Sequence, residues 1–178
     1  ADLINQINLQ GAAALADMNG RWLSQTPPRI AHWQWLDLTG SGQDELILLR
    51  ASTAQYPHLT DLTILTPGEA GQLTLLHHQP LSSRSQPVGR PELAATGDLT
   101  QDGLPDVVLH DSVSGLSFML TAHEGVANLS PLPDSCMGSL GILDLNETGK
   151  LSVVRDGCEN ENGRVVTQWN GRSFTNLP

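Results

Sequence analysis

Three nine-residue segments of this chain place oxygen-bearing side chains at alternate positions. They span residues 37–45, 98–106 and 144–152, and each has Asp at its first position, Leu at its second and Gly at its sixth. Ca²⁺ takes about six to eight oxygen ligands, which a tight loop can supply from alternate residues. The second segment therefore predicts a Ca²⁺ loop, in which Gly103 allows the sharp turn. The expected ligands are Asp98, Thr100, Asp102, the carbonyl of Leu104, and Asp106.

An EF-hand shares the first part of this pattern, but it needs a Glu at position twelve, where the second segment has Leu109. The other two segments have fewer carboxylates at the expected ligand positions, so we expect the affinity for Ca²⁺ to fall from the second segment to the first and then to the third. The alternative for each segment is a turn in which Asp and Gly cap backbone N–H groups and bind no metal. A weaker site is expected at Asp37, Thr39, Ser41 and Glu45, and the third segment offers Asp144, Asn146, Thr148 and Ser152.

Apolar, β-rich runs follow all three segments, at residues 46–49, 107–109 and 151–154. The first positions of the segments are 61 and then 46 residues apart, which brackets the period of four-stranded propeller blades. We therefore predict one all-β, propeller-like domain over residues 1–178, with three four-stranded repeats and an N-terminal half-repeat. An open β-sandwich of imperfect repeats is the alternative. The repeats are expected at about 32–80, 93–133 and 139–178, and an N-terminal hairpin at about 14–24.

Hairpin signals complete each repeat, and the last of them has Asn170-Gly171 between two β-rich runs, which favours a two-residue type I′ turn. Residues 1–12 leave two interpretations open. They form a short amphipathic helix with Leu3, Ile4 and Ile7 on one face, or they supply strands that complete the N-terminal repeat.

The second segment and its flanks, from Gly97 to Val108, resemble the Ca²⁺ loop of FG-GAP and VCBS repeats, the blades of integrin-α-like propellers. The resemblance extends from about Ala31 onward, and it is strongest at residues 98–106, fair at 37–45 and weak at 144–152. It implies propeller blades that bind Ca²⁺. The Phe-Gly and Gly-Ala-Pro signatures of the integrin version are missing, which favours the looser bacterial kind.

Two cysteines, Cys136 and Cys158, lie at equal distances on either side of residue 147, near the middle of the third segment. If the strands that flank this segment pair antiparallel, the two cysteines face each other at a spacing that a disulfide can bridge. The alternative is two unpaired buried thiols. A disulfide implies an oxidising compartment, so we expect a periplasmic or secreted protein.

The charge of the chain excludes some partners. Asp and Glu number 19 against 9 Lys and Arg, which gives a net charge of −10, and Lys150 is the single lysine. No basic stripe is present to neutralise phosphates, so nucleic acid is excluded as a partner. No apolar run approaches the roughly 20 residues of a membrane helix, so we expect no membrane insertion.

No nucleophile elbow, phosphate loop or spaced zinc ligands were found in the sequence, so we expect a protein that is not an enzyme. The favoured function is a Ca²⁺-stabilised binding module for a protein partner, as an inhibitor or an assembly subunit. A lectin is the alternative, because Trp33 and Trp35 share one strand face and Trp stacks on sugars; packing of both inside the fold competes with that role. A hydrolase comes third. A monomer is favoured over a dimer, because residues before Ala14 can supply the missing strands.

Overall fold

Three four-stranded antiparallel sheets make up most of the chain that the structure describes. This computed structural model describes residues 3–10, 29–51, 60–81, 91–123, 125–145, 147–158 and 163–177. The strands of each sheet pair in chain order. The predicted all-β class, with three four-stranded units, is confirmed. Sheet 1 contains β1 (Arg29–Leu36), β2 (Glu45–Ala51), β3 (Thr60–Pro67) and β4 (Leu73–Pro80); sheet 2 contains β5 (Pro91–Gly97), β6 (Asp106–Asp111), β7 (Ser117–His123) and β8 (Val126–Pro131); sheet 3 contains β9 (Leu140–Leu143), β10 (Ser152–Asp156), β11 (Arg164–Trp169) and β12 (Phe174–Asn176).

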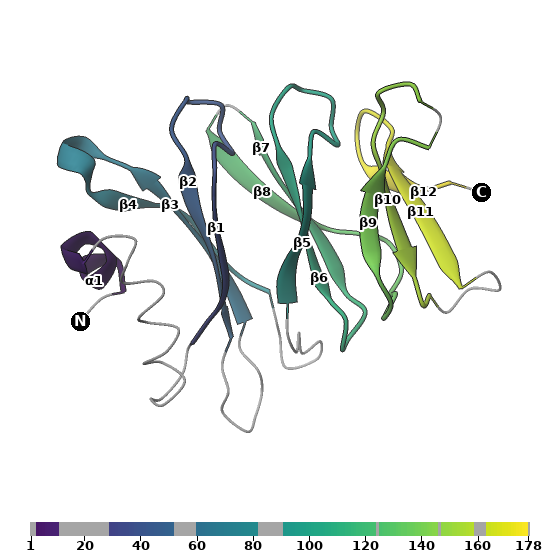
Figure 1. The fold of residues 1–178 in the computed structure, drawn as a ribbon, viewed down its shortest axis with the longest axis horizontal. Coiled ribbons are helices and arrows are strands. Elements are labelled where there is room, and N and C mark those ends of the chain that lie inside the picture. Colours follow the sequence, from purple (N-terminus) through teal and green to yellow (C-terminus); the bar gives the residue numbers. More distant parts are fainter. Residues whose placement is uncertain are drawn as a thin grey trace.

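The sheets stand in a row and pack face to face (Figure 1). Strand β5 lies against β1 on one side and against β9 on the other. Within the described residues, the three sheets do not close into a barrel or a ring. The row therefore has two end faces, one on sheet 1 and one on sheet 3.

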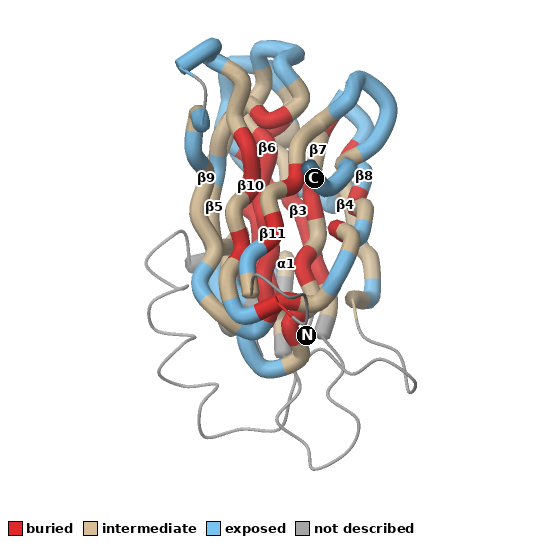
Figure 2. Tube along the Cα trace, turned by 90° about the vertical axis from the view of Figure 1, so that its right-hand side faces the viewer, coloured by how far each residue is buried: buried red, intermediate tan, exposed pale blue. Residues whose placement is uncertain are grey.

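The central strands are buried because sheets or a helix cover both of their sides. Residues 46–49 and 107–109 are all 0% exposed, and Figure 2 shows buried segments running through the middle of the molecule. A strand buried on both faces has no need of alternating polar residues, which explains these continuous apolar runs.

Two apolar layers join the three sheets. Between sheets 1 and 2, Ile47 and Ile64 share a cluster with Leu109. Between sheets 2 and 3, Val108 and Met119 share a cluster with Val153, as well as with the half-buried residues Leu140, Ile142, Leu151 and Phe174.

A short helix, α1 (Leu3–Gln10), covers the end face of sheet 1. Its Ile7 is 2% exposed and packs in one cluster with Leu46 and Leu48. The Asn8 side chain accepts a hydrogen bond from the N–H of Leu73 at 2.7 Å and donates one to its carbonyl at 3.1 Å. The helix, one of the two interpretations left open for residues 1–12, is therefore the one observed over Leu3–Gln10. The hairpin expected at about 14–24 lies outside the described residues.

The structure contains no helix, among the residues it describes, that is long and apolar enough to cross a membrane.

The turn between β11 and β12 differs from the sequence prediction. Trp169 pairs with Phe174, so the loop has four residues rather than two. The Asn170 side chain accepts hydrogen bonds from the N–H groups of Arg172 and Ser173, each at 3.0 Å. A type I′ turn needs a positive φ at both central residues, and here Gly171 has one, at 93°, but Asn170 does not. The type I′ prediction is therefore wrong, because the Asn side chain closes a wider loop.

A disulfide joins Cys136 to Cys158 across an isolated antiparallel bridge, with 4.0 Å between their Cα atoms. Next to it, the N–H of Gly138 donates to the carbonyl of Asp156 at 3.0 Å, and the N–H of Met137 donates to the carbonyl of Gly157 at 3.1 Å. The predicted pairing of the two cysteines is therefore present, and it ties the segment before β9 to the end of β10.

Gly138→Ala is expected to lower the free energy of unfolding by about 1–3 kcal/mol. A Cβ at this position lies 2.6 Å from the carbonyl oxygen of Asp156, a backbone atom held in the disulfide-linked pairing. Urea denaturation measures the effect. Gly141→Ala is the matched control, because nothing lies within 4 Å of a Cβ placed there; we expect a change within about 0.5 kcal/mol. Equal losses in both variants would show that close backbone approach is not the cause.

Candidate metal loops

The three Asp loops share one pattern of hydrogen bonds. In each, the carboxylate at the first position accepts backbone N–H groups from the fifth or sixth position, which pulls the loop into a tight turn. Asp37 accepts from Gly42 at 3.0 Å; Asp98 accepts from Asp102 at 3.1 Å and Gly103 at 3.0 Å; Asp144 accepts from Thr148 at 3.1 Å and Gly149 at 2.6 Å.

Each loop also has a left-handed backbone at its fourth and sixth positions. A non-glycine residue with positive φ is uncommon, and the hydrogen bonds to the first Asp hold such residues in place here. The sixth position is always Gly, which adopts this conformation without strain. The φ values are 70° and 80° for Gly40 and Gly42, 62° and 86° for Gln101 and Gly103, and 54° and 80° for Glu147 and Gly149.

The acid at the ninth position of the second loop, Asp106, accepts hydrogen bonds from the start of that loop. We call such a ninth-position carboxylate the acidic tie of its loop. Asp106 is 1% exposed. Its Oδ2 accepts hydrogen bonds from the N–H groups of Leu99 and Thr100, both at 2.8 Å, and from the Thr100 hydroxyl at 3.1 Å. The sequence predicted a metal ligand at this position, with a backbone cap as the alternative, and the structure shows Asp106 capping the backbone.

Burial raises the pKa of Asp106 to about 6, since desolvation of the carboxylate outweighs the hydrogen bonds from Thr100 and Leu99, and the nearby Asp102 charge adds to the rise. Among the described residues, no basic side chain forms an ion pair with Asp106. Within the described residues, this buried carboxylate therefore has hydrogen bonds but no neutralising charge.

Glu45 has the same role in the first loop and is 0% exposed. Its carboxylate accepts from the N–H groups of Leu38 at 2.9 Å and Thr39 at 3.1 Å, and from the Thr39 hydroxyl at 2.8 Å. The hydroxyl of Thr66 on β3 donates a fourth hydrogen bond at 3.3 Å. Sequence reasoning missed Thr66, because it comes from a strand distant in the sequence.

The first loop contains a buried carboxylate oxygen without a hydrogen-bond donor. Asp37 uses Oδ2 to accept the N–H of Gly42, and its Oδ1 is buried with no partner. A buried oxygen that carries part of a negative charge is costly unless a donor or a cation satisfies it. The position of Oδ1 at the head of an Asp loop therefore fits a bound cation.

The third loop lacks the acidic tie. Ser152 takes the ninth position, and its buried hydroxyl accepts a hydrogen bond from the side chain of Gln168 at 3.0 Å rather than from the loop backbone. Asn146 lies outside the described residues. The third loop thus has one carboxylate, Asp144, at a ligand position among its described residues.

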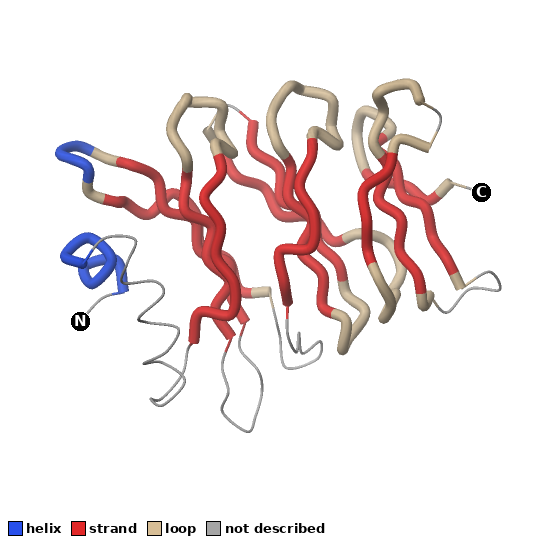
Figure 3. Tube along the Cα trace, viewed as in Figure 1, coloured by secondary structure: helices blue, strands red, loops and turns tan. Residues whose placement is uncertain are grey.

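All three loops lie along the same edge of the molecule, each between the first two strands of its sheet (Figure 3). The first two loops touch: a Cβ on Gly40 would lie 2.4 Å from Cδ2 of Leu104. The expected carbonyl ligand of the second loop therefore comes from a residue that packs against the first loop. A change of conformation in either loop must affect the other.

No group of three or more His, Cys, Asp and Glu side chains is arranged to hold a metal ion in the described part of the chain. In the second loop, Asp98 accepts a hydrogen bond from the backbone N–H of Asp102, and Asp106 accepts one from the Thr100 hydroxyl. The donors are carboxylate, hydroxyl and carbonyl oxygens, which suit Ca²⁺ or Mg²⁺ rather than softer metals.

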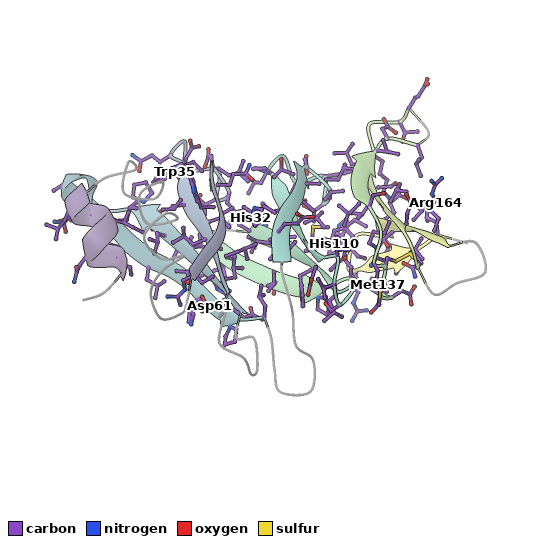
Figure 4. The ribbon with its side chains drawn as sticks, turned by 60° about the horizontal axis from the view of Figure 1, so that its bottom comes forward. His32, Trp35, Asp61, His110, Met137 and Arg164 are labelled. Atoms are coloured by element: carbon purple, nitrogen blue, oxygen red, sulfur yellow. A yellow bond between two sulfur atoms is a disulfide. The ribbon has the colours of Figure 1, made fainter. Side chains whose placement is uncertain are left out.

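The two candidate tryptophans lie on the α1 side of sheet 1, opposite Leu46 and Leu48 of β2. Trp35 is half-buried and packs against the cluster that includes Ile7 (Figure 4). Trp33 is 36% exposed. The structure therefore gives Trp35 a packing role, which sequence reasoning had weighed against sugar stacking.

Comparisons with family models, curated proteins and solved structures found no match to this chain.

Proposed function

We propose that this protein is an extracytoplasmic interaction module whose propeller-like repeats bind Ca²⁺ in their first and second Asp loops. The observation that carries the proposal is the buried Oδ1 of Asp37, which has no hydrogen-bond donor. The equivalent loop of sheet 2 has a positive φ at the same two positions and three carboxylates at the expected ligand positions, against two in the first loop, so it is the stronger candidate.

Ca²⁺ would supply charge neutralisation and a fixed loop geometry. In the second loop, Asp98, Asp102 and the carbonyl of Leu104 would hold it, together with the Oδ1 atom of Asp106, because Oδ2 is occupied by three hydrogen bonds. In the first loop, Asp37 would contribute Oδ1.

A protein partner fits this arrangement because rigid sheets hold the loops at one edge, where binding residues commonly lie. The exposed acidic side chains of these loops, among them Asp102 and Glu147, favour a partner with a basic surface. The disulfide supports an oxidising compartment.

Two hydroxyls of the described residues contact a His nitrogen, Ser117 with His110 at 3.0 Å and Thr63 with His78 at 3.2 Å. Both Ser117 and Thr63 are buried, at 1% and 5% exposed, so we propose a role without catalysis.

The first test is thermal unfolding with Ca²⁺ and with chelator, together with calorimetric titration of Ca²⁺. Ca²⁺ at about 100 times its Kd is expected to add about 2.7 kcal/mol to the free energy of unfolding for each site that it fills. We expect two Ca²⁺ ions per chain, and one each for Asp37→Asn and Asp98→Asn.

Asp144→Asn is the matched control, since it removes the same first-position charge from the loop that lacks an acidic tie. It should keep both ions and the full response to Ca²⁺. A metal-free protein that melts at one temperature with and without Ca²⁺ would contradict the proposal.

A further inference from the structure

Leu104, the seventh residue of the second Asp loop, packs its side chain onto the first Asp loop. A Cβ added to Gly40 would lie 2.4 Å from Cδ2 of Leu104, and 3.7 and 3.8 Å from its Cγ and Cδ1. Apart from the chain neighbours of Gly40, the described residues bring no other atom nearer to that position. The two loops lie along the same edge of the molecule (Figure 3). One side chain of the second loop therefore joins them.

The backbone of Leu104 belongs to the expected metal site of the second loop. Its N–H donates to Oδ1 of Asp102 at 2.9 Å, and the N–H of Asp102 donates to Oδ1 of Asp98 at 3.1 Å. The carbonyl of Leu104 is itself an expected ligand. Binding of Ca²⁺ by these three groups would hold the backbone of Leu104 and thereby fix the side chain that lies on the first loop.

The first loop has a glycine where it receives this side chain. Gly40 holds the fourth position, at which all three loops have a left-handed backbone. Gln101 and Glu147 hold the same position in the second and third loops, with φ values of 62° and 54° against 70° for Gly40. The conformation therefore does not demand glycine. The first loop needs it because Leu104 occupies the place of a Cβ.

Gly40 lies between two residues of the first loop whose N–H groups donate to acidic side chains. On one side of it, the N–H of Thr39 donates to Glu45 at 3.1 Å. On the other side, the N–H of Gly42 donates to Oδ2 of Asp37 at 3.0 Å. The other carboxylate oxygen of Asp37 is buried without a hydrogen-bond donor. A contact that holds Gly40 therefore restrains the turn that closes on the carboxylate expected to bind Ca²⁺.

We propose that Leu104 couples the first and second Asp loops, so that Ca²⁺ in one loop raises the affinity of the other loop for Ca²⁺. The inference rests on the proposed function, because it needs Ca²⁺ in both loops. Ordering a loop costs conformational entropy, and a second ligand that meets an already ordered site loses less of it. Ca²⁺ in the second loop holds Leu104 against Gly40, so the first loop is more ordered before its own ion binds.

The coupling is equal in both directions, because the two binding equilibria belong to one free-energy cycle. Repulsion between the two ions opposes it. Each loop has at least two carboxylates at its expected ligand positions, and these offset the repulsion. We therefore expect a net gain in affinity of about tenfold, within the range typical of coupled sites.

Calorimetric titration of Ca²⁺ into variants of the whole chain tests the coupling. Asp98→Asn disables the second loop and should raise the Kd of the first loop about tenfold. Leu104→Ala keeps the backbone carbonyl but removes the side chain from Gly40. It should still bind two ions, and in this background Asp98→Asn should change the Kd of the first loop by less than about twofold. Gln43→Ala is the matched control, because Gln43 holds the same seventh position in the first loop and is exposed; Asp98→Asn should keep its full effect there.

A second set of variants changes the contact from the side of the first loop. Gly40→Ala places a Cβ against the Leu104 side chain, so it should weaken binding of Ca²⁺ by the first loop. Adding Leu104→Ala makes room for that Cβ and should return the Kd of the first loop to its value in Leu104→Ala alone. Circular dichroism in chelator establishes that each variant is folded.

The outcomes separate the coupling from the proposed function. Fewer than two ions in wild-type protein would overturn the proposed function and the coupling with it. Two ions, together with an effect of Asp98→Asn that is equal in the wild-type and Leu104→Ala backgrounds, would overturn the coupling alone. A loss in Gly40→Ala that Leu104→Ala does not relieve would do the same.

Discussion

Reducing the Cys136–Cys158 disulfide is expected to lower the free energy of unfolding by about 3 kcal/mol, the chain-entropy cost of a loop of this length. The two cysteines are 22 positions apart in the sequence, and the loop that they close contains the third Asp loop together with β9 and β10. The disulfide thus restrains the repeat whose Asp loop lacks an acidic tie. Urea denaturation with and without reductant measures the loss.

Hydrogen exchange locates the effect. The amide protons of Cys136, Met137 and Gly138 donate to the carbonyls of Gly115, Gly157 and Asp156, and they should lose protection first on reduction. Cys136→Ser combined with Cys158→Ser is the control, since reductant should leave its stability unchanged. Wild-type protein that is equally stable in both redox states would contradict the prediction.

Much of the fold could be predicted because its signals are local. Residues 46–49 and 107–109 are apolar runs, each preceded by a Gly-containing Asp segment, and this combination identifies a buried strand without knowledge of its neighbours. The symmetric placement of Cys136 and Cys158 about the third loop likewise needed only the antiparallel pairing of adjacent strands.

The remaining features depend on contacts between distant segments. Residues 3–10 are compatible with a helix or a strand, and the face of sheet 1 that receives Ile7 decides between them. That same helix makes Trp35 a packing residue. Neither outcome can be derived from the local pattern, because eight residues bury too little surface to fix their own conformation.

The candidate site likewise has features that the local sequence predicts and features that it does not. The spacing of Asp and Gly predicts the turn at the head of each loop, which depends on hydrogen bonds over four or five residues. The sequence treated a metal ligand and a backbone cap as alternatives for Asp106, because a ligand pattern assigns this carboxylate to a metal and says nothing about its second oxygen. The position of the carboxylate at the start of a buried strand directs that oxygen to the loop backbone.

The burial of Asp106 makes the free energy of unfolding depend on pH. Without Ca²⁺, the pKa of its carboxyl is raised from 3.8 to about 6 by desolvation in the folded protein. Between these two values the folded state binds more protons than the unfolded state, so the free energy of unfolding falls as the pH rises. A difference of about two pKa units corresponds to a loss of about 3 kcal/mol between pH 4 and pH 7.

Among the described residues, the other carboxyl group with a shifted pKa, Asp156, acts outside this pH window. The pKa of Asp156 is lowered, mainly by the hydrogen bond from Arg164, so any contribution to stability is lost only as the pH falls below the ordinary carboxyl range. The decline between pH 4 and pH 6 should therefore be traceable to Asp106. Urea denaturation at a series of pH values in chelator measures it.

The variant Asp106→Asn tests how much the buried charge lowers the free energy of unfolding, separately from the role of that charge in binding Ca²⁺. The Asn side chain keeps an oxygen acceptor for the N–H groups of Leu99 and Thr100 but never ionises. In chelator at pH 7 we expect the variant to be more stable than wild type, by up to about 3 kcal/mol, with no decline between pH 4 and pH 6. Asp144→Asn should retain the wild-type decline, because Asp106 is intact in it.

Saturating Ca²⁺ should make wild-type protein more stable than Asp106→Asn, which is the reverse of the order expected in chelator. A cation beside Asp106 favours the ionised carboxylate, so saturating Ca²⁺ should remove the pH-dependent decline in wild-type protein and stabilise it at pH 7. The Asn variant should gain little from Ca²⁺ in the second loop. A decline that persists in saturating Ca²⁺ would mean that Asp106 meets no cation and serves only as a backbone cap. A wild-type protein with no decline in chelator would mean that the buried carboxylate is already neutralised within the chain.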